Sequence, residues 1–128
     1  MNSKFDVLVV SDIIEHLSNP GLMLEGIKRF CDQNSIIIIT TPHSFGLMNY
    51  LRFIFGKFHE GTEHVITFNI PNLINLLKKH GFHVETIDMC YQNHSYKKKL
   101  FKIGKLFFKR FPKFGGTIFV VATFGKHE

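Results

Sequence analysis

Residues 5 to 20 read FDVLVVSDIIEHLSNP and contain the beginning of an α/β fold. The run at residues 5 to 10 is short, apolar and rich in β-branched side chains, which is typical of a strand covered on both faces in a parallel sheet. Asn19 is a favourable N-cap, and Pro20 suits the first turn of a helix. The stretch therefore predicts a buried strand, a polar turn and then a helix.

Strand and helix alternate further along the chain. Residues 36 to 40 read IIIIT and predict a second buried strand, which we expect Thr41 and Pro42 to end because proline cannot continue the ladder. A second helix is expected between Asn69 as its N-cap and Gly81 as its left-handed last residue. Two further strands are expected at residues 82 to 89 and 117 to 124. This order predicts an α/β fold with right-handed crossovers.

The composition indicates one folded domain over residues 1 to 128. Of these residues, 45% are hydrophobic and 20% are charged, which is the profile of a folding domain rather than a disordered tail. The apolar runs are far shorter than the roughly 20 residues of a membrane-spanning helix. Acidic residues in the first apolar stretch argue against a secretory signal peptide, so a cytoplasmic location is expected. Cys31 and Cys90 fit no paired metal or redox spacing and are expected to be buried thiols.

The positive charge is concentrated toward the C-terminus. The net charge is +6, but residues 1 to 88 carry 7 basic and 9 acidic side chains, whereas residues 89 to 128 carry 9 basic side chains and Glu128. A local patch of this kind indicates a partner or a surface. Nucleic acid is an unlikely partner, because the basic residues alternate with aliphatic ones and no known reading module is present.

A basic amphipathic insert is predicted at residues 95 to 114. Residues 97 to 114 read KKKLFKIGKLFFKRFPKF, and on a helix four lysines would form a narrow stripe opposite a broad apolar face. Such helices lie in a membrane interface or cover a hydrophobic partner. Alternatively, the apolar face packs on the sheet and the lysines are solvated. The stripe consists of Lys98, Lys102, Lys105 and Lys109.

Four stretches together carry a resemblance to a known family. They are FDVLVVSDIIEHL at residues 5 to 17, Asn19-Pro20, IIIITTPHS at 36 to 44, and EHVITFNIPNLINLLKKHGF at 63 to 82. In this order they resemble the C-terminal half of class I S-adenosylmethionine-dependent methyltransferases, and are similar to the ubiquinone-biosynthesis O-methyltransferases. The resemblance implies a partial doubly wound, Rossmann-like sheet of roughly four strands flanked by helices. Its last strand would be antiparallel and lie between the fifth and sixth strands of the complete fold.

The N-terminal half of that family has no counterpart in the sequence. There is no Gly-x-Gly, hence no glycine-rich turn to bring backbone amides against S-adenosylmethionine. The strand at residues 5 to 10 would also keep one unpaired hydrophobic edge. We therefore expect a fragment or half-unit that pairs this edge with the missing N-terminal half or with a second copy of itself.

Asp12, Glu15 and His16 form the pattern D-x-x-E-H directly after the first strand. Spacings of three and four place them on one face of a helical turn, at the sheet edge where open α/β folds bind ligands. In one interpretation Ser11 and Asp12 bind the cofactor and His16 is a general base. In another, the triplet is similar to the E-x-x-E-H that the resembled family associates with a divalent metal, although imidazole is a poor Mg²⁺ ligand. In a third, Glu15 and His16 only cap the helical turn.

Two more histidines are candidate substrate residues. His59 and His64 are five residues apart, which excludes the H-E-x-x-H zinc signature because that motif needs a spacing of four on a helix. The resemblance implies that the E-H-V containing His64 lies over the substrate pocket. His43 follows the second strand and is expected at the same sheet edge. The alternative for both is a solvated loop histidine.

These observations leave two functions open. The first is methyl transfer from S-adenosylmethionine to a small, lipid-like acceptor by a fragment or half-unit of an enzyme, with peripheral membrane contact through the lysine stripe. Phenylalanine-rich stretches at residues 45 to 58 and 97 to 114 favour a hydrophobic acceptor. The second is a non-catalytic binding or assembly module that docks on a partner or a membrane.

Overall fold

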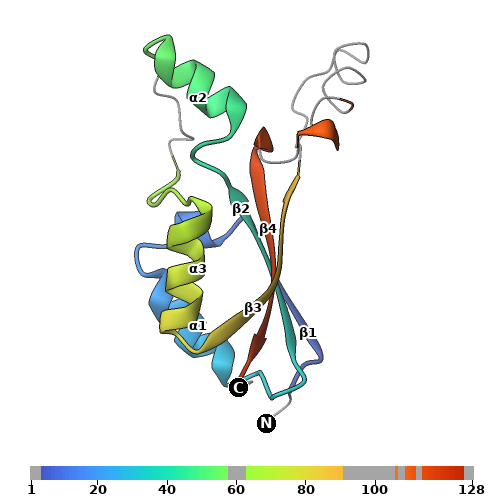
Figure 1. The fold of residues 1–128 in the computed structure, drawn as a ribbon. Coiled ribbons are helices and arrows are strands. Elements are labelled where there is room, and N and C mark those ends of the chain that lie inside the picture. The colour runs from blue at the N-terminus through green and yellow to red at the C-terminus, as the bar shows by residue number, and fades with distance from the viewer. Residues whose placement is uncertain (1–3, 58–62, 91–105, 107–108, 112–113, 126–128) are drawn as a thin grey trace.

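A four-stranded mixed sheet forms the body of the molecule (Figure 1). The computed structural model describes residues 4–57, 63–90, 106, 109–111 and 114–125. The strand order is β1-β2-β4-β3; β1 and β2 are parallel, and β4 is antiparallel to both of its neighbours. The predicted fold class is confirmed, including the antiparallel last strand. The strands are β1 (Val7–Ser11), β2 (Ile36–Pro42), β3 (Phe82–Cys90) and β4 (Thr117–Phe124).

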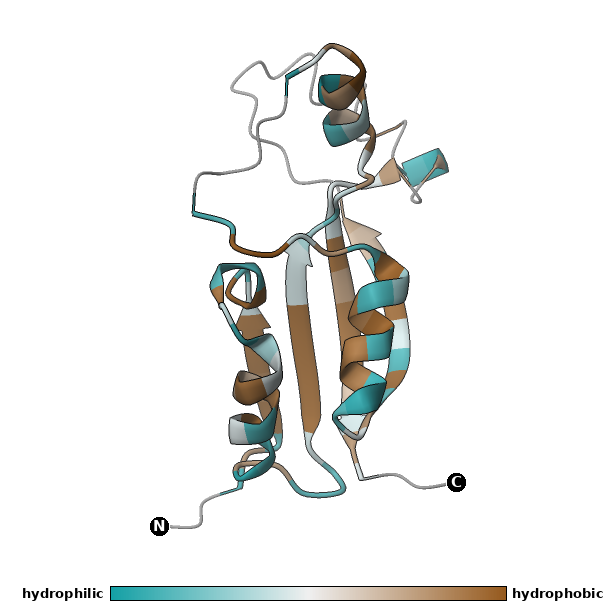
Figure 2. Ribbon diagram, turned by 90° about the vertical axis from the view of Figure 1, so that its left-hand side faces the viewer, coloured by the Kyte–Doolittle hydropathy of each residue, from teal (hydrophilic) through white to brown (hydrophobic). Residues whose placement is uncertain are grey.

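Two helices, α1 (Pro20–Lys28) and α3 (Ile70–Lys79), cover the same face of the sheet (Figures 1 and 2). Their N-caps are the predicted Asn19 and Asn69, and each side chain accepts a hydrogen bond from the backbone amide three residues on. Gly81 follows α3 with a φ of +76°, which glycine adopts without strain. Local capping therefore sets both helix starts and the end of α3, as predicted.

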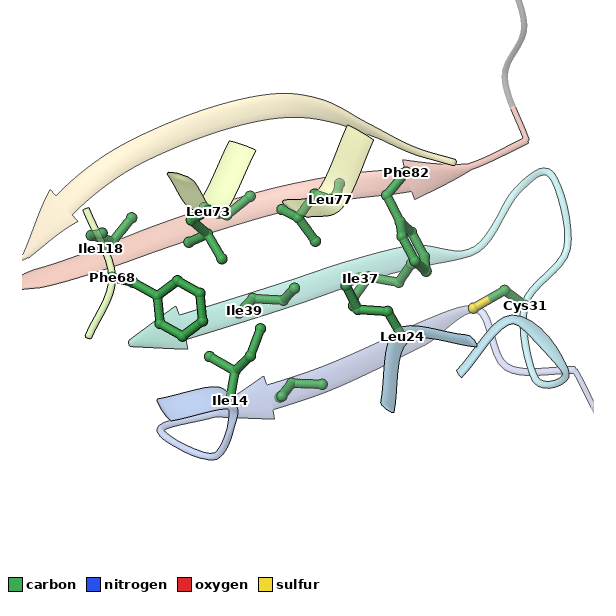
Figure 3. Close-up of a cluster of buried hydrophobic side chains, with 13 residues drawn as sticks. Ile14, Leu24, Cys31, Ile37, Ile39, Phe68, Leu73, Leu77, Phe82 and Ile118 are labelled. Atoms are coloured by element: carbon green, nitrogen blue, oxygen red, sulfur yellow. The ribbon is translucent and has the colours of Figure 1, made fainter. Parts of the chain in front are cut away.

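The core lies between these helices and the sheet (Figure 3). Leu24 of α1 and Leu73 and Leu77 of α3 are fully buried. Buried and less buried residues alternate along β2, so the core occupies one face of the sheet. The fully buried strand residues in this core are Ile37, Ile39, Ile118, Val120 and Ala122.

β1 is covered on one face, whereas the sequence predicted cover on both. Val10 is buried in the core, but Val7 and Val9 on the opposite face are 50% and 62% exposed. β1 pairs with β2 alone in the described sheet, so the predicted open edge is confirmed. The prediction of two-sided burial was wrong because it assumed a second layer of helices, and both α1 and α3 lie on the core face.

The ends of two strands also differ from the prediction. β2 continues through Thr41 to Pro42, which stands opposite Thr117 of β4. Proline fits here because its φ suits an extended strand and its missing N–H removes only one ladder donor at the last position. Cys31 is buried as predicted, but Cys90 is exposed because it is the last residue of β3.

Two short helical elements add to this framework. The 3-10 helix η1 (Ile14–His16) follows β1 and provides the helical turn expected for Glu15 and His16. The helix α2 (Leu47–Ile54) was not predicted; it stands beyond the end of the sheet (Figure 1), and none of its residues is buried. α2 therefore contributes nothing to the core between α1, α3 and the sheet.

The basic insert can be compared with the structure at few positions. Lys109 is exposed, as a stripe of solvated lysines requires. None of the helices in the described part of the chain is long and apolar enough to cross a membrane. The remaining lysines of the predicted stripe lie outside the described residues; they are Lys98, Lys102 and Lys105.

Truncation of Leu73 tests the position of the core. Leu73→Ala should lower the free energy of unfolding by about 2–5 kcal/mol, because a fully buried side chain leaves a cavity between α3 and the sheet. Leu22 on α1 is 69% exposed and provides the matched control; Leu22→Ala should change that free energy by less than about 0.5 kcal/mol. Urea denaturation followed by circular dichroism measures both. Equal losses would contradict this core.

Candidate functional site

The carboxyl ends of β1 and β2 lie side by side and carry most of the predicted site residues. Parallel pairing places Ser11 opposite Thr40. The backbone N–H of Asp12 donates to the carbonyl of Thr40 at 3.0 Å, and Asp12 has a φ of +50°. Aspartate tolerates this left-handed conformation better than most residues. The chain therefore turns sharply at Asp12 from β1 into η1.

Ser11, Thr40 and Asp12 are joined by their side chains. The Thr40 hydroxyl donates to Oδ1 of Asp12 at 3.4 Å, and Oγ of Ser11 lies 2.9 Å from Oγ1 of Thr40. A hydroxyl has one hydrogen to donate, so Ser11 is the donor in its contact with Thr40. The structure thus brings the two predicted cofactor residues together at the sheet edge and orients both through Thr40.

Glu15 is a buried acid at the centre of the site. Its side chain is 2% exposed, and Oε2 accepts a hydrogen bond from Oγ1 of Thr41 at 3.0 Å. Oε1 is buried and has no hydrogen-bond partner among the described residues. A buried carboxylate oxygen without a donor is costly, so this atom is a candidate to contact a ligand atom or a metal ion.

His16 is held in one tautomer by the loop that precedes α3. Its Nδ1 lies 3.0 Å from the backbone carbonyl of Glu63. A carbonyl can only accept, so Nδ1 carries the hydrogen and Nε2 of the neutral ring keeps a lone pair. Nε2 lies 3.9 Å from the unpartnered Oε1 of Glu15, and the His16 side chain is 36% exposed. His16 therefore presents a basic nitrogen beside a buried acid, within reach of solvent.

His64 completes a cluster of three with Glu15 and His16. Its ring meets that of His16 edge to face, with centroids 4.9 Å apart. One ligand atom from each of the three residues lies within 4.8 Å of the others. One carboxylate and two imidazoles are a donor set for Zn²⁺ or another divalent transition metal rather than Mg²⁺. The cluster contains His64 where the sequence suggested Asp12, whose carboxylate accepts from Thr40 instead.

Two main-chain hydrogen bonds attach the loop of His64 to η1. The backbone amides of Val65 and Ile66 both donate to the carbonyl of Glu15, at 2.9 and 3.0 Å. With the contact between His16 and Glu63, three hydrogen bonds fix this loop beside the site. These long-range hydrogen bonds bring His64 close to Glu15.

His43 is buried at the end of β2. It is 7% exposed, and its Nδ1 has no hydrogen-bond partner within the described chain. Burial lowers the pKa of His43, and a hydrogen bond with the backbone of Gly115 partly opposes this. His43 is not one of the three clustered residues. Its predicted role toward substrate stays a prediction, and the alternative of a solvated loop histidine is wrong because the ring is buried.

Two threonines that organise the site were not predicted as site residues. Thr40 and Thr41 belong to β2; Thr40 orients Ser11 and Asp12, and Thr41 donates a hydrogen bond to Glu15. The useful signal was a pair of hydroxyl residues at the carboxyl end of a buried strand, where side chains reach the ligand edge of the sheet. His59 and Glu60 lie outside the described residues.

Comparison with known proteins identifies the fold. No protein-family model and no curated protein sequence matches the chain. A SAM-dependent methyltransferase from Thermotoga maritima matches with a TM-score of 0.68 and 12% identity, over 97% of this chain and 58% of that chain. The magnesium protoporphyrin IX methyltransferase from Synechocystis, with bound SAH, matches with a TM-score of 0.61 and 13% identity, over 98% of this chain and 47% of that chain.

A third match comes from a protein complex. A chain in the complex between the Haloferax volcanii Trm112 methyltransferase activator and its partner protein matches with a TM-score of 0.64 and 12% identity, over 99% of this chain and 57% of that chain. These structural neighbours are SAM-dependent methyltransferases of the class I fold, and identities this low support a likeness of fold alone. The chain spans about half the length of the solved structures it matches.

The residues present do not make a complete site for S-adenosylmethionine. The sequence has no Gly-x-Gly, the element that lets backbone approach the cofactor closely. The polar groups at the end of β1 are Ser11 and Asp12, and both are already joined to Thr40. Binding of S-adenosylmethionine is therefore supported by the likeness of fold alone.

Loss of the Thr41 hydroxyl should destabilise the site. Thr41→Val leaves both oxygens of the buried Glu15 carboxylate without a described donor, so the free energy of unfolding should fall by about 1–3 kcal/mol. Thr67→Val, at an exposed threonine, is the matched control and should change it by less than about 0.5 kcal/mol. Thermal and urea unfolding measure the difference. If Thr41→Val is as stable as the control variant, the buried Glu15 carboxylate does not depend on the hydrogen bond from Thr41.

The buried His43 should make stability depend on pH. Because its pKa in the folded chain lies below the ordinary 6.5, the unfolded chain binds the extra proton first. The contribution of His43 to the free energy of unfolding is therefore complete above pH 6.5, and it is lost as the pH falls toward the pKa of His43 in the folded chain. The free energy of unfolding should therefore decrease on acidification below about pH 6.5, and His43→Gln should flatten that decrease. His83→Gln, at an exposed histidine, should leave the profile unchanged; equal flattening by both variants would refute the assignment.

Proposed function

We propose that this chain is one half-unit of a SAM-dependent methyltransferase that methylates an oxygen or nitrogen of a small, hydrophobic acceptor. The observation that carries the proposal is the placement of Glu15 and His16 at the carboxyl end of β1, within a β1-β2-β4-β3 sheet of methyltransferase type. The resemblance to ubiquinone-biosynthesis O-methyltransferases agrees with such an acceptor. When bound, S-adenosylmethionine supplies an electrophilic methyl group.

His16 is the proposed general base. Its tautomer leaves Nε2 free to accept a proton from the acceptor, while Nδ1 stays bonded to the carbonyl of Glu63. The Oε1 atom of Glu15, 3.9 Å from Nε2, would stabilise the resulting imidazolium charge. Ser11 and Asp12 are proposed to face the cofactor, and His43 and His64 the acceptor.

A second polypeptide unit is proposed to complete the site through β1. The open edge of β1 can pair with a further parallel strand, and the exposed Val7 and Val9 can be covered by the helices that follow it. This unit would bring the glycine-rich turn. It is either the N-terminal half of such an enzyme or a second copy of the chain.

Glu15, His16 and His64 also fit a divalent transition metal. The fit rests on the unpartnered Oε1 of Glu15 and on the lone pair at Nε2 of His16. A metal held by these residues would polarise an acceptor hydroxyl and ease its deprotonation. In that case His16 would act as a ligand, and the free-base role would not apply.

Cofactor binding by the native assembly tests the proposed function. The purified chain alone should bind SAM more weakly than about 100 μM, a binding free energy of roughly 5.5 kcal/mol. A tagged chain isolated from its native cells with its bound partners should bind SAM more tightly and transfer labelled methyl groups to a lipid extract. Isothermal titration and label counting measure the two, and light scattering gives the assembly size.

Replacement of His16 provides the variant for this assay. His16→Ala should reduce methyl transfer by about 10²–10⁴-fold, and His83→Ala, at an exposed histidine, should not. A native assembly that neither binds SAM nor transfers methyl would refute the enzyme half-unit. The non-catalytic binding or assembly module would then be the correct function.

Metal titration tests the three-residue cluster. The purified chain should bind Zn²⁺, and Glu15→Gln or His64→Ala should weaken binding at least about tenfold, because each removes one of three ligands. His83→Ala is the matched histidine control. Isothermal titration gives the affinities, and identical affinities for all four proteins would show that the cluster binds no metal.

A further inference from the structure

α2 contributes no residue to the described hydrophobic core. None of its eight residues is buried, whereas α1 and α3 bury leucines against the sheet. A helix this short is not stable in water by its own hydrogen bonds. Contacts outside the described core are therefore expected to add to the stability of α2.

The side chains on α2 and its flanks are large and apolar. Phe53 and Phe55 are 60% and 74% exposed. Exposed apolar side chains that gather into a patch usually mark a binding site for a protein or a membrane, and here several lie on one short segment. The other strongly exposed members are Phe45, Met48, Tyr50 and Ile54.

The two charged side chains within residues 45 to 57 are positive. Residues 43 to 57 include Arg52 and Lys57 and contain no aspartate or glutamate. Residues 89 to 125 contain no acidic residue either, and their described positions before β4 lie at the same end of the molecule as α2 (Figure 1). Lys109 and Arg110 are exposed there, and the Arg110 guanidinium lies 5.4 Å from the Phe111 ring centroid.

We propose that this aromatic end, residues 45–57 with residues 106, 109–111 and 114, inserts into the interface of an anionic lipid bilayer. Exposed rings beside arginine and lysine fit the boundary between acyl chains and headgroups. The absence of acidic residues from both stretches of sequence complements negatively charged headgroups. A neutral protein groove would gain nothing from this charge.

The bilayer would lie at the end of the molecule that carries the site. α2 follows the carboxyl end of β2, and the side-chain amide of Asn49 donates to the backbone carbonyl of His43 at 3.0 Å. A membrane at α2 therefore approaches the sheet edge where Glu15 and His16 lie. The inference goes beyond the proposed function, because lipid binding does not require methyl transfer.

A single tryptophan can report the insertion, because the chain contains no native tryptophan. Phe53→Trp should show a blue-shifted emission with vesicles of phosphatidylcholine and phosphatidylglycerol. Leu22→Trp, at an exposed position of α1, should show none. Binding to these vesicles, measured by cosedimentation, should weaken as the salt concentration rises. The double variant Phe53→Ser plus Phe55→Ser should bind at least about tenfold more weakly. Arg52→Gln should bind about fivefold more weakly.

Three results would overturn the proposal. The first is an unchanged Phe53→Trp spectrum with anionic vesicles. The second is equal, salt-insensitive binding to vesicles of phosphatidylcholine alone, which would exclude headgroup charge as a determinant. The third is a dimer in light scattering that Phe53→Ser dissociates while vesicle binding is absent, which would assign the surface to a second copy. Leu22→Ser controls for surface substitution, and circular dichroism confirms that each variant is folded.

Discussion

The hydrogen bonding of β4 on both of its edges is the constraint on which the rest of the fold depends. β4 enters antiparallel between β2 and β3 and joins the unit of β1, α1 and β2 to the unit of α3 and β3. Without it, α3 would have no sheet beside β2 to cover, and the leucines of α3 would lose their core. The loop before α3 would then not reach η1, and His64 would not lie beside His16. The candidate site is thus a consequence of the sheet order.

Local sequence signals predicted most of the fold because they act over a few residues. Each of these signals predicts a local element: the asparagine caps predict helix starts, Gly81 a helix end, and the β-branched runs strands. The strands and the helices α1 and α3 lie where these signals predict them. The exposed face of β1 could not be read in this way, because burial depends on which layers lie on each side of the sheet. α2 was missed for a related reason: none of its residues is buried, so the pattern of core residues gives no signal for this helix.

The site was predictable in part. Their spacing predicted Glu15 and His16 as candidates, because both lie on one helical turn. Their position at the end of the first strand predicted Ser11 and Asp12. Spacing could not choose between Asp12 and His64 as the third partner, since His64 comes from a loop 48 residues from His16 in sequence and meets it through tertiary hydrogen bonds. The buried state of Glu15, which gives the cluster its chemical interest, follows from Thr41 and the core and has no local signature.

The open edge of β1 has consequences for the synthesis of this protein. The five residues of β1 leave one strand edge unpaired in the described sheet, and two of its valines are exposed. Such strands resemble the surfaces on which chains join edge to edge into aggregates. If the proposed second unit pairs with β1, a chain made without that unit would keep this edge bare and would depend on chaperones during its synthesis. Under that proposal, coexpression of the second unit should raise the soluble yield more than a lower expression temperature does.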